Sequence, residues 1–380
     1  MLIKESRARH LSTKSPLGYY PQSYWEARER FQAAAEQASA EQASWPITAR
    51  GPAGEALSMQ VARWGSPQAR RWLLLTTGLH GSEAPFGSAV VLRLLHELRS
   101  TEPAMDTSIL LVHGLNPYGY AWVRRANEDN IDLNRNALLP GEEYRGVPPL
   151  YHYVYNAFDP HCRRAVSSFY LQAWWLILRF SKAALQSSLP VGQYEYPRGL
   201  FYGGRELAES LRVVQQNVPE WMPQAEEIMH LDFHTGLGRW AGCKLLMDYP
   251  ESHQDADWIQ QWAPAGSVES AASNRTAYHA RGSLGPWMKH VVFPEAHYRY
   301  AAAEFGTYGS VMVLRSLVLE LQAHFSHAPE SRFYRWAKRR LRETFVPGSF
   351  YWRKHTLEQG FSLCKKAYAA LAGELVSSDS

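Results

Sequence analysis

The stretch Leu75-Thr76-Thr77-Gly78-Leu79-His80-Gly81-Ser82-Glu83 leads from a strand through a tight turn toward a helix. Residues 72–77 form a short, largely apolar run, which is typical of a strand buried on both faces. Pro85 then opens a pattern of apolar residues at helical spacing, and proline is favoured in a first helical turn. The stretch therefore predicts a strand, a turn and a helix of α/β type.

The same pattern recurs along the chain. Buried strands are predicted over residues 108–113, 227–233 and 244–248, and an amphipathic helix over residues 309–325. Strands separated by helices predict an α/β fold with a mixed, mostly parallel sheet and helices on both faces. In such sheets, ligands gather where the strands run out into loops.

We expect three parts along the chain. The first is a polar N-terminal helical extension, with a helix near residues 25–44 that ends before a proline, and the last is a basic helical C-terminal extension. The central α/β domain contains an insertion that we expect to roof its cleft. The proposed bounds are 1–45 for the N-terminal extension, 46–329 for the central domain, 137–225 for the insertion and 330–380 for the C-terminal extension.

The composition narrows the class of protein. With 46% hydrophobic and 20% charged residues, the chain can bury a large core, and its formal charge of +4 gives no general reason to expect nucleic acid. The three cysteines (Cys162, Cys243 and Cys364) are far apart, so neither a disulfide framework nor a thiolate zinc site is predicted. No signal-peptide core or membrane-spanning run is evident. We therefore predict a cytoplasmic protein.

The C-terminal part is locally basic, with ten Lys or Arg against three Glu over residues 330–370. Aromatic residues are interleaved with these charges. Peripheral contact with an anionic membrane stays open on this basis, but a helix whose aromatics dock on the protein is the favoured interpretation. Neither nucleic acid nor a membrane is expected as the main partner.

His80 and Glu83 form an HxxE pair, and His234 follows another strand in Leu231-Asp232-Phe233-His234-Thr235-Gly236. Two histidines and one carboxylate suit a catalytic zinc ion that keeps one position open for water. A chance pair on a surface loop is the alternative, because two-residue patterns are common. The chain has no GxSxG and no HExxH motif, which argues against a serine hydrolase and a thermolysin-like site.

Further motifs follow in order: Asn116-Pro117-Tyr118-Gly119, Asp132-Leu133-Asn134-Arg135-Asn136 and Ala303-Glu304-Phe305-Gly306-Thr307. Together with the HxxE pair and the later histidine, they resemble the zinc carboxypeptidases of the M14 type. More closely, GLHGSE, DLNRN, DFHTG and EFGT resemble the DUF2817 branch of this superfamily of carboxypeptidases and deacylases. The resemblance covers roughly residues 50 to 325 and implies a zinc-carboxypeptidase-like fold.

The resemblance implies a metal site and a base. His80, Glu83 and His234 would bind one zinc ion, Zn²⁺. Glu304 would be the general base that activates the attacking water and then protonates the leaving amine. The alternative for Glu304 is a structural carboxylate at a strand edge.

The resemblance also implies substrate contacts. Arg125 best matches the arginine that polarises the scissile carbonyl, and Arg124 is its close rival. Asn134 and Arg135 match the pair that receives the substrate's terminal carboxylate. Asp232 stands two residues before a proposed ligand, so on a strand both side chains share a face, and it could orient that ligand.

We therefore predict a zinc-dependent hydrolase that cleaves an amide bond next to a carboxylate-bearing residue. Its partner would be a peptide or an N-acyl amino acid, since an aspartoacylase-like or desuccinylase-like deacylase is the alternative. A non-catalytic binding protein with the same fold is a third hypothesis. Tyr278, Tyr298 and Tyr300 precede Glu304, but none lies in a matching tyrosine motif, so side-chain specificity stays open.

Overall fold

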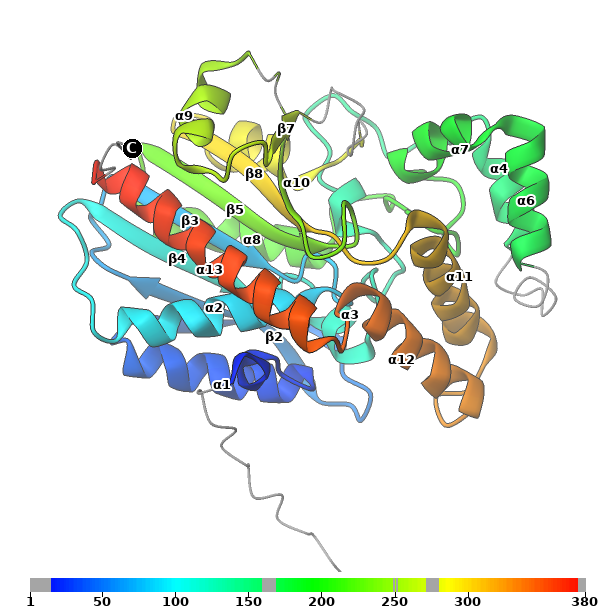
Figure 1. Ribbon diagram of the computed structural model, residues 1–380, viewed down its shortest axis with the longest axis horizontal. Helices are drawn as coiled ribbons and strands as arrows, with labels where there is room; N and C mark the ends of the chain where they lie inside the picture. The colour runs from blue at the N-terminus through cyan, green and yellow to red at the C-terminus, as the bar shows by residue number, and fades with distance from the viewer. Residues whose placement is uncertain (1–14, 159–168, 249, 251, 271–279, 375–380) are drawn as a thin grey trace, which may run out of the picture.

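The computed structural model describes residues 15–158, 169–248, 250, 252–270 and 280–374 (Figure 1). Its centre is a single sheet of eight strands. The strands are β1 (Glu41–Arg50), β2 (Ala56–Trp64), β3 (Arg71–Thr77), β4 (Thr107–His113), β5 (Glu227–Thr235), β6 (Cys243–Met247), β7 (Val268–Ser270) and β8 (His297–Phe305).

The strand order is β1-β2-β4-β3-β5-β8-β6-β7. The four central strands, β4, β3, β5 and β8, are parallel, whereas β1 and β2 add on antiparallel at one side. At the other side, β6 runs antiparallel to β8 and β7 runs parallel to β6. The prediction of a mixed, mostly parallel sheet is confirmed.

Helices surround this sheet. The longer ones are α1 (Tyr24–Gln37), α2 (Ala84–Leu98), α6 (Phe169–Phe180), α8 (Glu209–Trp221), α9 (Gln254–Trp262), α11 (Ser310–Ser326), α12 (Arg332–Phe345) and α13 (Phe350–Ala372). The shorter ones are α3 (Pro117–Trp122), α4 (Tyr151–Ala157), α7 (Lys182–Ser188) and α10 (Leu284–Trp287), with single turns at Pro16–Tyr19, Leu133–Arg135, Leu189–Val191 and Met288–Val292. None of the described helices is long and apolar enough to cross a membrane.

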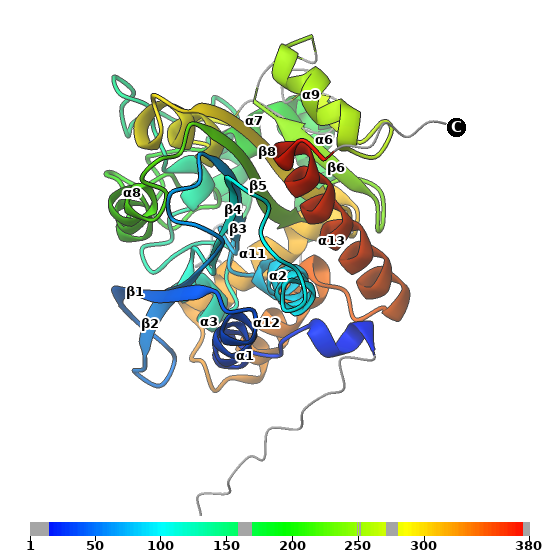
Figure 2. The ribbon, with the colours of Figure 1, turned by 90° about the vertical axis from the view of Figure 1, so that its left-hand side faces the viewer.

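Strand β3 shows how both faces of the sheet are covered. Its side chains alternate, so Leu73 and Leu75 join the core with α2 and α13, while Trp72 and Leu74 join the core with α8 and α10. Figure 2 shows α2 and α13 on one side of the sheet and α8 on the other. Burial on both faces explains why this strand reads as a continuous apolar run.

The N-terminal helix is shorter than predicted. Helix α1 ends at Gln37, and residues 41–50 form the edge strand β1, so the predicted helix over residues 25–44 was wrong in its last part. In β1, Trp45 and Ile47 are buried and their neighbours are not, which is the two-residue period of a strand. Pro46 is tolerated because an edge strand pairs on one side only.

The basic C-terminal segment packs against the main core. Trp352, Leu363 and Cys364 of α13 are fully buried in the same cluster as Phe86 of α2. The docked helix is confirmed for Trp352, whereas Tyr351 and the residue before it are exposed. The expected boundary at residue 329 therefore does not separate two hydrophobic cores.

The predicted insertion over residues 137–225 has two different parts. Helices α4, α6 and α7 gather beside α11 (Figure 1), where Val154, Phe158, Phe169 and Leu176 form a small separate core with Val318. Helix α8, in contrast, packs on the face of the sheet and belongs to its core. The cavity described below is bordered by α4, α6 and α7 and by residues 189–191 and Phe201, whereas no residue of α8 lines it.

Candidate metal centre and active site

His80 and Glu83 lie in the turn between β3 and α2, just beyond the end of β3 at Thr77. His234 lies near the end of β5, and the register of the sheet pairs it with Glu304 on β8. Because β3, β5 and β8 are parallel neighbours, their carboxyl ends meet at one edge. The topology thus brings together groups that are far apart in the sequence.

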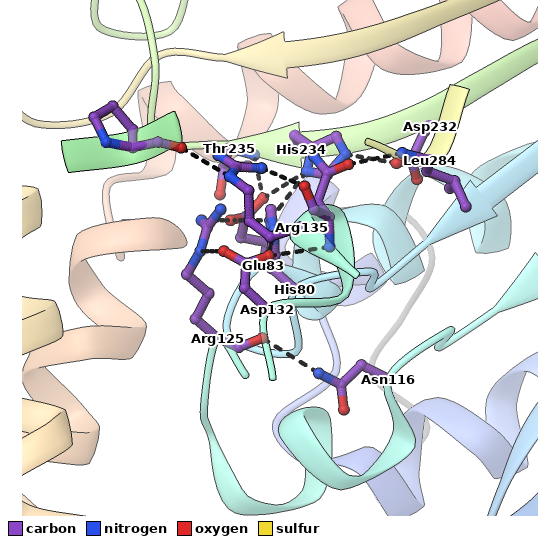
Figure 3. A network of polar contacts seen from close by, with 12 residues as sticks. His80, Glu83, Asn116, Arg125, Asp132, Arg135, Asp232, His234, Thr235 and Leu284 are labelled. Carbon is purple, nitrogen blue, oxygen red and sulfur yellow. Dashed lines mark hydrogen bonds and ion pairs between the residues drawn. The ribbon is translucent and has the colours of Figure 1, made fainter. Parts of the chain in front are cut away.

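Gly81 allows the turn to approach a second loop. A Cβ atom at this position would lie 1.9 Å from the carbonyl carbon of Gly119, so any side chain would force the two segments apart. Asn116 caps α3 by accepting a hydrogen bond from the Gly119 amide at 2.7 Å. Its Nδ2 donates to the carbonyl of Arg125 at 3.2 Å, which fixes that residue beside the turn (Figure 3).

Three ligand atoms converge at this edge of the sheet (Figure 3). The Nδ1 atoms of His80 and His234 are 3.2 Å apart. Glu83 places Oε1 2.9 Å from the first of these nitrogens and Oε2 3.2 Å from the second. All three side chains are buried, and the ligand atoms lie within 4.8 Å of one another.

A carboxylate stands behind each imidazole. Asp132 Oδ1 lies 3.1 Å from His80 Nε2, and Asp232 Oδ2 lies 2.6 Å from His234 Nε2. Burial alone would raise the pKa of Asp132, but Arg125 and His80 outweigh it and hold that pKa well below its usual range. An ionised carboxylate accepts hydrogen bonds only, so each imidazole donates through Nε2, and in its neutral form it keeps a lone pair on Nδ1.

Lone pairs from two nitrogens and a carboxylate therefore point at one another, which is a repulsive arrangement unless a positive charge lies between them. Burial opposes protonation of His234, yet Asp232 and Glu83 outweigh it and raise the pKa of His234 well above its usual value. The site thus favours a cation at this position. Its donor set fits a divalent metal ion.

Glu83 is held by more than the two histidines. Its Oε2 accepts a hydrogen bond from the backbone amide of Thr235 at 2.8 Å. Burial alone would raise the pKa of Glu83, but His80 and His234 outweigh burial and lower it. Glu83 is therefore ionised at neutral pH and available as a ligand.

The two neighbouring arginines lie in different places. Arg125 borders the cavity, donates from Nε to Asp132 Oδ2 at 2.9 Å and places Nη1 3.3 Å from Glu83 Oε1. Arg124 is buried and pairs with Glu320 on α11 at 3.0 Å. The structure thus brings Arg125 to the site and leaves Arg124 outside it, which corrects the expectation that Arg124 contacts substrate.

Glu304 borders the same cavity. Burial raises the pKa of its carboxyl group to about 7. Its Oε2 atom has no hydrogen-bond partner within the described part of the chain. A buried carboxyl group without a partner for one oxygen is costly, which is typical of a group kept for chemistry.

Asn134 and Arg135 also border the cavity. The Asn134 side chain accepts a hydrogen bond from the Leu284 amide at 3.0 Å, which orients its amide group. Arg135 donates from Nε to the Pro190 carbonyl at 2.8 Å, and Tyr194 donates its hydroxyl to the Arg135 carbonyl at 2.8 Å. Both residues are thus held firmly beside the proposed ligands.

Asp132 was missed as a functional residue, although it begins the DLNRN motif. Its two oxygens link His80 to Arg125, which no spacing along the chain could indicate. Asp232 lies behind His234, as its position two residues earlier on a strand predicts. Tyr298 and Tyr300 are buried on β8 beside His230 and Asp232, and Tyr278 lies outside the described residues.

The family-model comparison places these motifs in a known family. Residues 20–359 match the model described as "Protein of unknown function (DUF2817)". The chain belongs to the DUF2817 family. No curated protein sequence matches it.

Several solved structures are similar in fold to this DUF2817 protein. Bovine thrombin-activatable fibrinolysis inhibitor is 10% identical, with a TM-score of 0.51, over 94% of this chain and 99% of that one. Carboxypeptidase A from Helicoverpa armigera is 14% identical, with a TM-score of 0.46, over 84% of this chain and 72% of that one. The succinylglutamate desuccinylase of Chromobacterium violaceum is 15% identical, with a TM-score of 0.36, over 84% and 74%. The first of these likenesses shows the carboxypeptidase-like fold.

We expect the purified chain to hold one divalent metal ion per molecule, measured by plasma mass spectrometry. His80→Ala and His234→Ala remove a nitrogen ligand and should abolish stoichiometric binding. Asp232→Asn keeps the ligands but loosens one, so its affinity should fall about 10- to 100-fold in a chelator competition. The exposed His355→Ala is the control. Equal metal content in His80→Ala and His355→Ala would contradict the site.

Proposed function

We propose that this DUF2817 protein is a zinc-dependent hydrolase that cleaves an amide bond next to a carboxylate-bearing residue. The observation that supports this most is the convergence of His80, Glu83 and His234 beside Glu304. Two imidazoles and one carboxylate form a common ligand set of catalytic zinc. A zinc ion bound by these residues would polarise the scissile carbonyl and lower the pKa of water.

Glu304 is the proposed general base. A carboxyl group with a pKa of about 7 can both accept and return a proton near neutral pH. Its Oε2 lacks a partner in the described structure and is therefore available to accept a proton from the attacking water. The same carboxyl group would then deliver the proton to the leaving amine. This role favours an enzyme over a non-catalytic binding protein.

Arg125 is the proposed stabiliser of the oxyanion. Its guanidinium group is fixed by Asp132 at 2.9 Å, so it needs little reorganisation when negative charge develops on the carbonyl oxygen. The group is only slightly exposed, which strengthens its interaction with that charge.

Asn134 and Arg135 are the proposed anchor for the substrate's carboxylate. Arginine binds carboxylates well because its planar group offers paired donors. The hydrogen bond from Arg135 Nε to the Pro190 carbonyl fixes the plane of the guanidinium group at the cavity wall. C-terminal peptides and N-acyl amino acids both carry a carboxylate near an amide, so both classes are proposed substrates.

Glu304→Gln should retain the metal and lose turnover by about 10³-fold, because glutamine cannot accept the proton. The assay is hydrolysis of C-terminal dipeptides and N-acyl amino acids by the zinc-loaded chain, and the exposed Glu358→Gln is the matched control. Wild-type kcat/KM should fall as the pH drops through the pKa of Glu304, since its acid form cannot act as a base. Burial raises this pKa to about 7, and the bound cation lowers it, so the acidic limb should lie below pH 7. Unchanged turnover in Glu304→Gln would show that Glu304 is not the general base.

Substitution of Arg125 and of Arg124 should have different effects on kcat. Arg125→Gln removes a positive charge beside the reacting carbonyl, so kcat should fall about 100-fold. It also leaves the buried Asp132 without this partner, so a loss of stability should accompany the loss of kcat. Arg124→Gln removes a partner of the buried Glu320, so it should cost about 3 kcal/mol of stability and keep most of kcat. Urea unfolding and steady-state kinetics measure the two effects. A large loss of kcat in Arg124→Gln, with kcat retained in Arg125→Gln, would instead assign the oxyanion role to Arg124.

A further inference from the structure

The cavity next to the proposed ligands is much larger and more apolar than a small substrate requires. It has a volume of about 850 Å³. Its polar lining includes the proposed site residues His80, Glu304 and Arg135, with Lys182 and Ser310 at the starts of α7 and α11. The rest of its lining comes largely from α6, α7 and α11, through apolar side chains such as Leu176, Leu185, Leu314 and Leu317.

This apolar wall is part of the fold. Leu176 of α6 is buried against Phe158 and Val318, and Leu314 of α11 packs on the same cluster. A wall of this kind gains free energy only when an apolar group replaces the water beside it. The cavity is therefore complementary to a ligand that is charged at one end and apolar along most of its length.

We propose that the substrate of this site is an amphiphile, with a carboxylate-bearing head and a long alkyl or acyl chain. The head lies at Arg135 and the chain runs along α6 and α11. An N-acyl amino acid with a long acyl chain has this chemistry. The inference rests on the proposed function for the bond that is cleaved, but the binding of the chain can be measured without turnover.

Acetate, octanoate and dodecanoate are suitable probes because they carry the carboxylate and the chain but no amide bond. Titration calorimetry with the zinc-loaded chain should show affinity that rises with length. Each methylene transferred from water into the cavity should raise the binding affinity about fourfold. Dodecanoate has about four more methylenes than octanoate, so it should bind on the order of 100-fold more tightly. Equal affinities for octanoate and dodecanoate would overturn the proposal.

Matched variants test whether the gain in affinity with chain length comes from this apolar wall. Ala173→Trp and Ala183→Trp place bulk at the cavity wall from α6 and α7, so either should remove the gain from octanoate to dodecanoate. Leu171→Trp, on the exposed side of α6, should keep it. A full gain in both wall variants would overturn the proposal. Failure to hydrolyse any amide would instead count against the proposed function alone.

The opposite side of α6 is exposed, and it is also apolar. Tyr170, Leu171, Trp174, Trp175 and Leu178 are between 49% and 72% exposed. Aromatic and aliphatic groups grouped in this way on one short helix are costly in water. Tryptophan and tyrosine are favoured where an apolar layer meets a polar one, as at a lipid surface.

The charged side chains on α4, α6 and α7 are of one sign. Helices α4, α6 and α7 contain no Asp or Glu, whereas Arg179 and Lys182 lie at the end of α6 and the start of α7. Helix α12 adds the exposed Arg332, Arg335 and Arg339. Both α6 and α12 pack on α11, and Figure 1 draws them at the same end of the molecule. This end is thus complementary to an anionic surface.

We further propose that the outer side of α6 docks on an anionic lipid surface. Sedimentation with vesicles of phosphatidylcholine and phosphatidylserine should carry down the full chain, and added salt should weaken the association. Vesicles of phosphatidylcholine alone should bind it less.

The double variant Trp174→Ser, Trp175→Ser should lose at least about tenfold in vesicle affinity, because two apolar anchors are removed. Trp240→Ser, at another exposed tryptophan, is the control and should bind as the wild type does. Absence of binding to both vesicle types, or equal binding by the double variant and the control, would overturn the docking proposal.

Discussion

The site depends on two buried hydrogen bonds, from His80 Nε2 to Asp132 and from His234 Nε2 to Asp232. Each bond fixes the tautomer of an imidazole, so that both Nδ1 lone pairs face the Glu83 carboxylate. Such an arrangement is stable only with a positive charge inside it. The fold therefore holds the donor groups in place before any cation arrives.

The register of the sheet extends this constraint to the rest of the site. Because β5 and β8 are parallel and in register, His234 and Glu304 lie side by side at the same edge. The β3 strand delivers His80 to that edge, and Gly81 lets its turn contact the loop that carries Arg125. Helices α6, α7 and α11 then close the edge with an apolar wall, which joins a charged centre to a long apolar cavity.

Much of this could be predicted from local pattern. The strand before His80 is apolar because both faces are buried, and the two-residue period of a strand placed Asp232 behind its histidine. Contacts between distant segments could not be predicted in this way. Motif spacing favoured Arg125 but left Arg124 as a close rival, because the contact that draws Arg124 away is made with Glu320 on a remote helix. Glu41, Gln42 and Ala43 continue the helix-favouring composition of the preceding segment, but their pairing with β2 makes them the start of β1.

The central claim is that two imidazoles and one carboxylate hold a zinc ion at this edge of the sheet. X-ray absorption at the zinc edge, on the zinc-loaded full-length chain, tests it most directly. We predict a shell of nitrogen and oxygen ligands with two imidazoles, which falls to one imidazole in His234→Ala. A sulfur ligand, or the same spectrum in the wild type and in His234→Ala, would contradict the account.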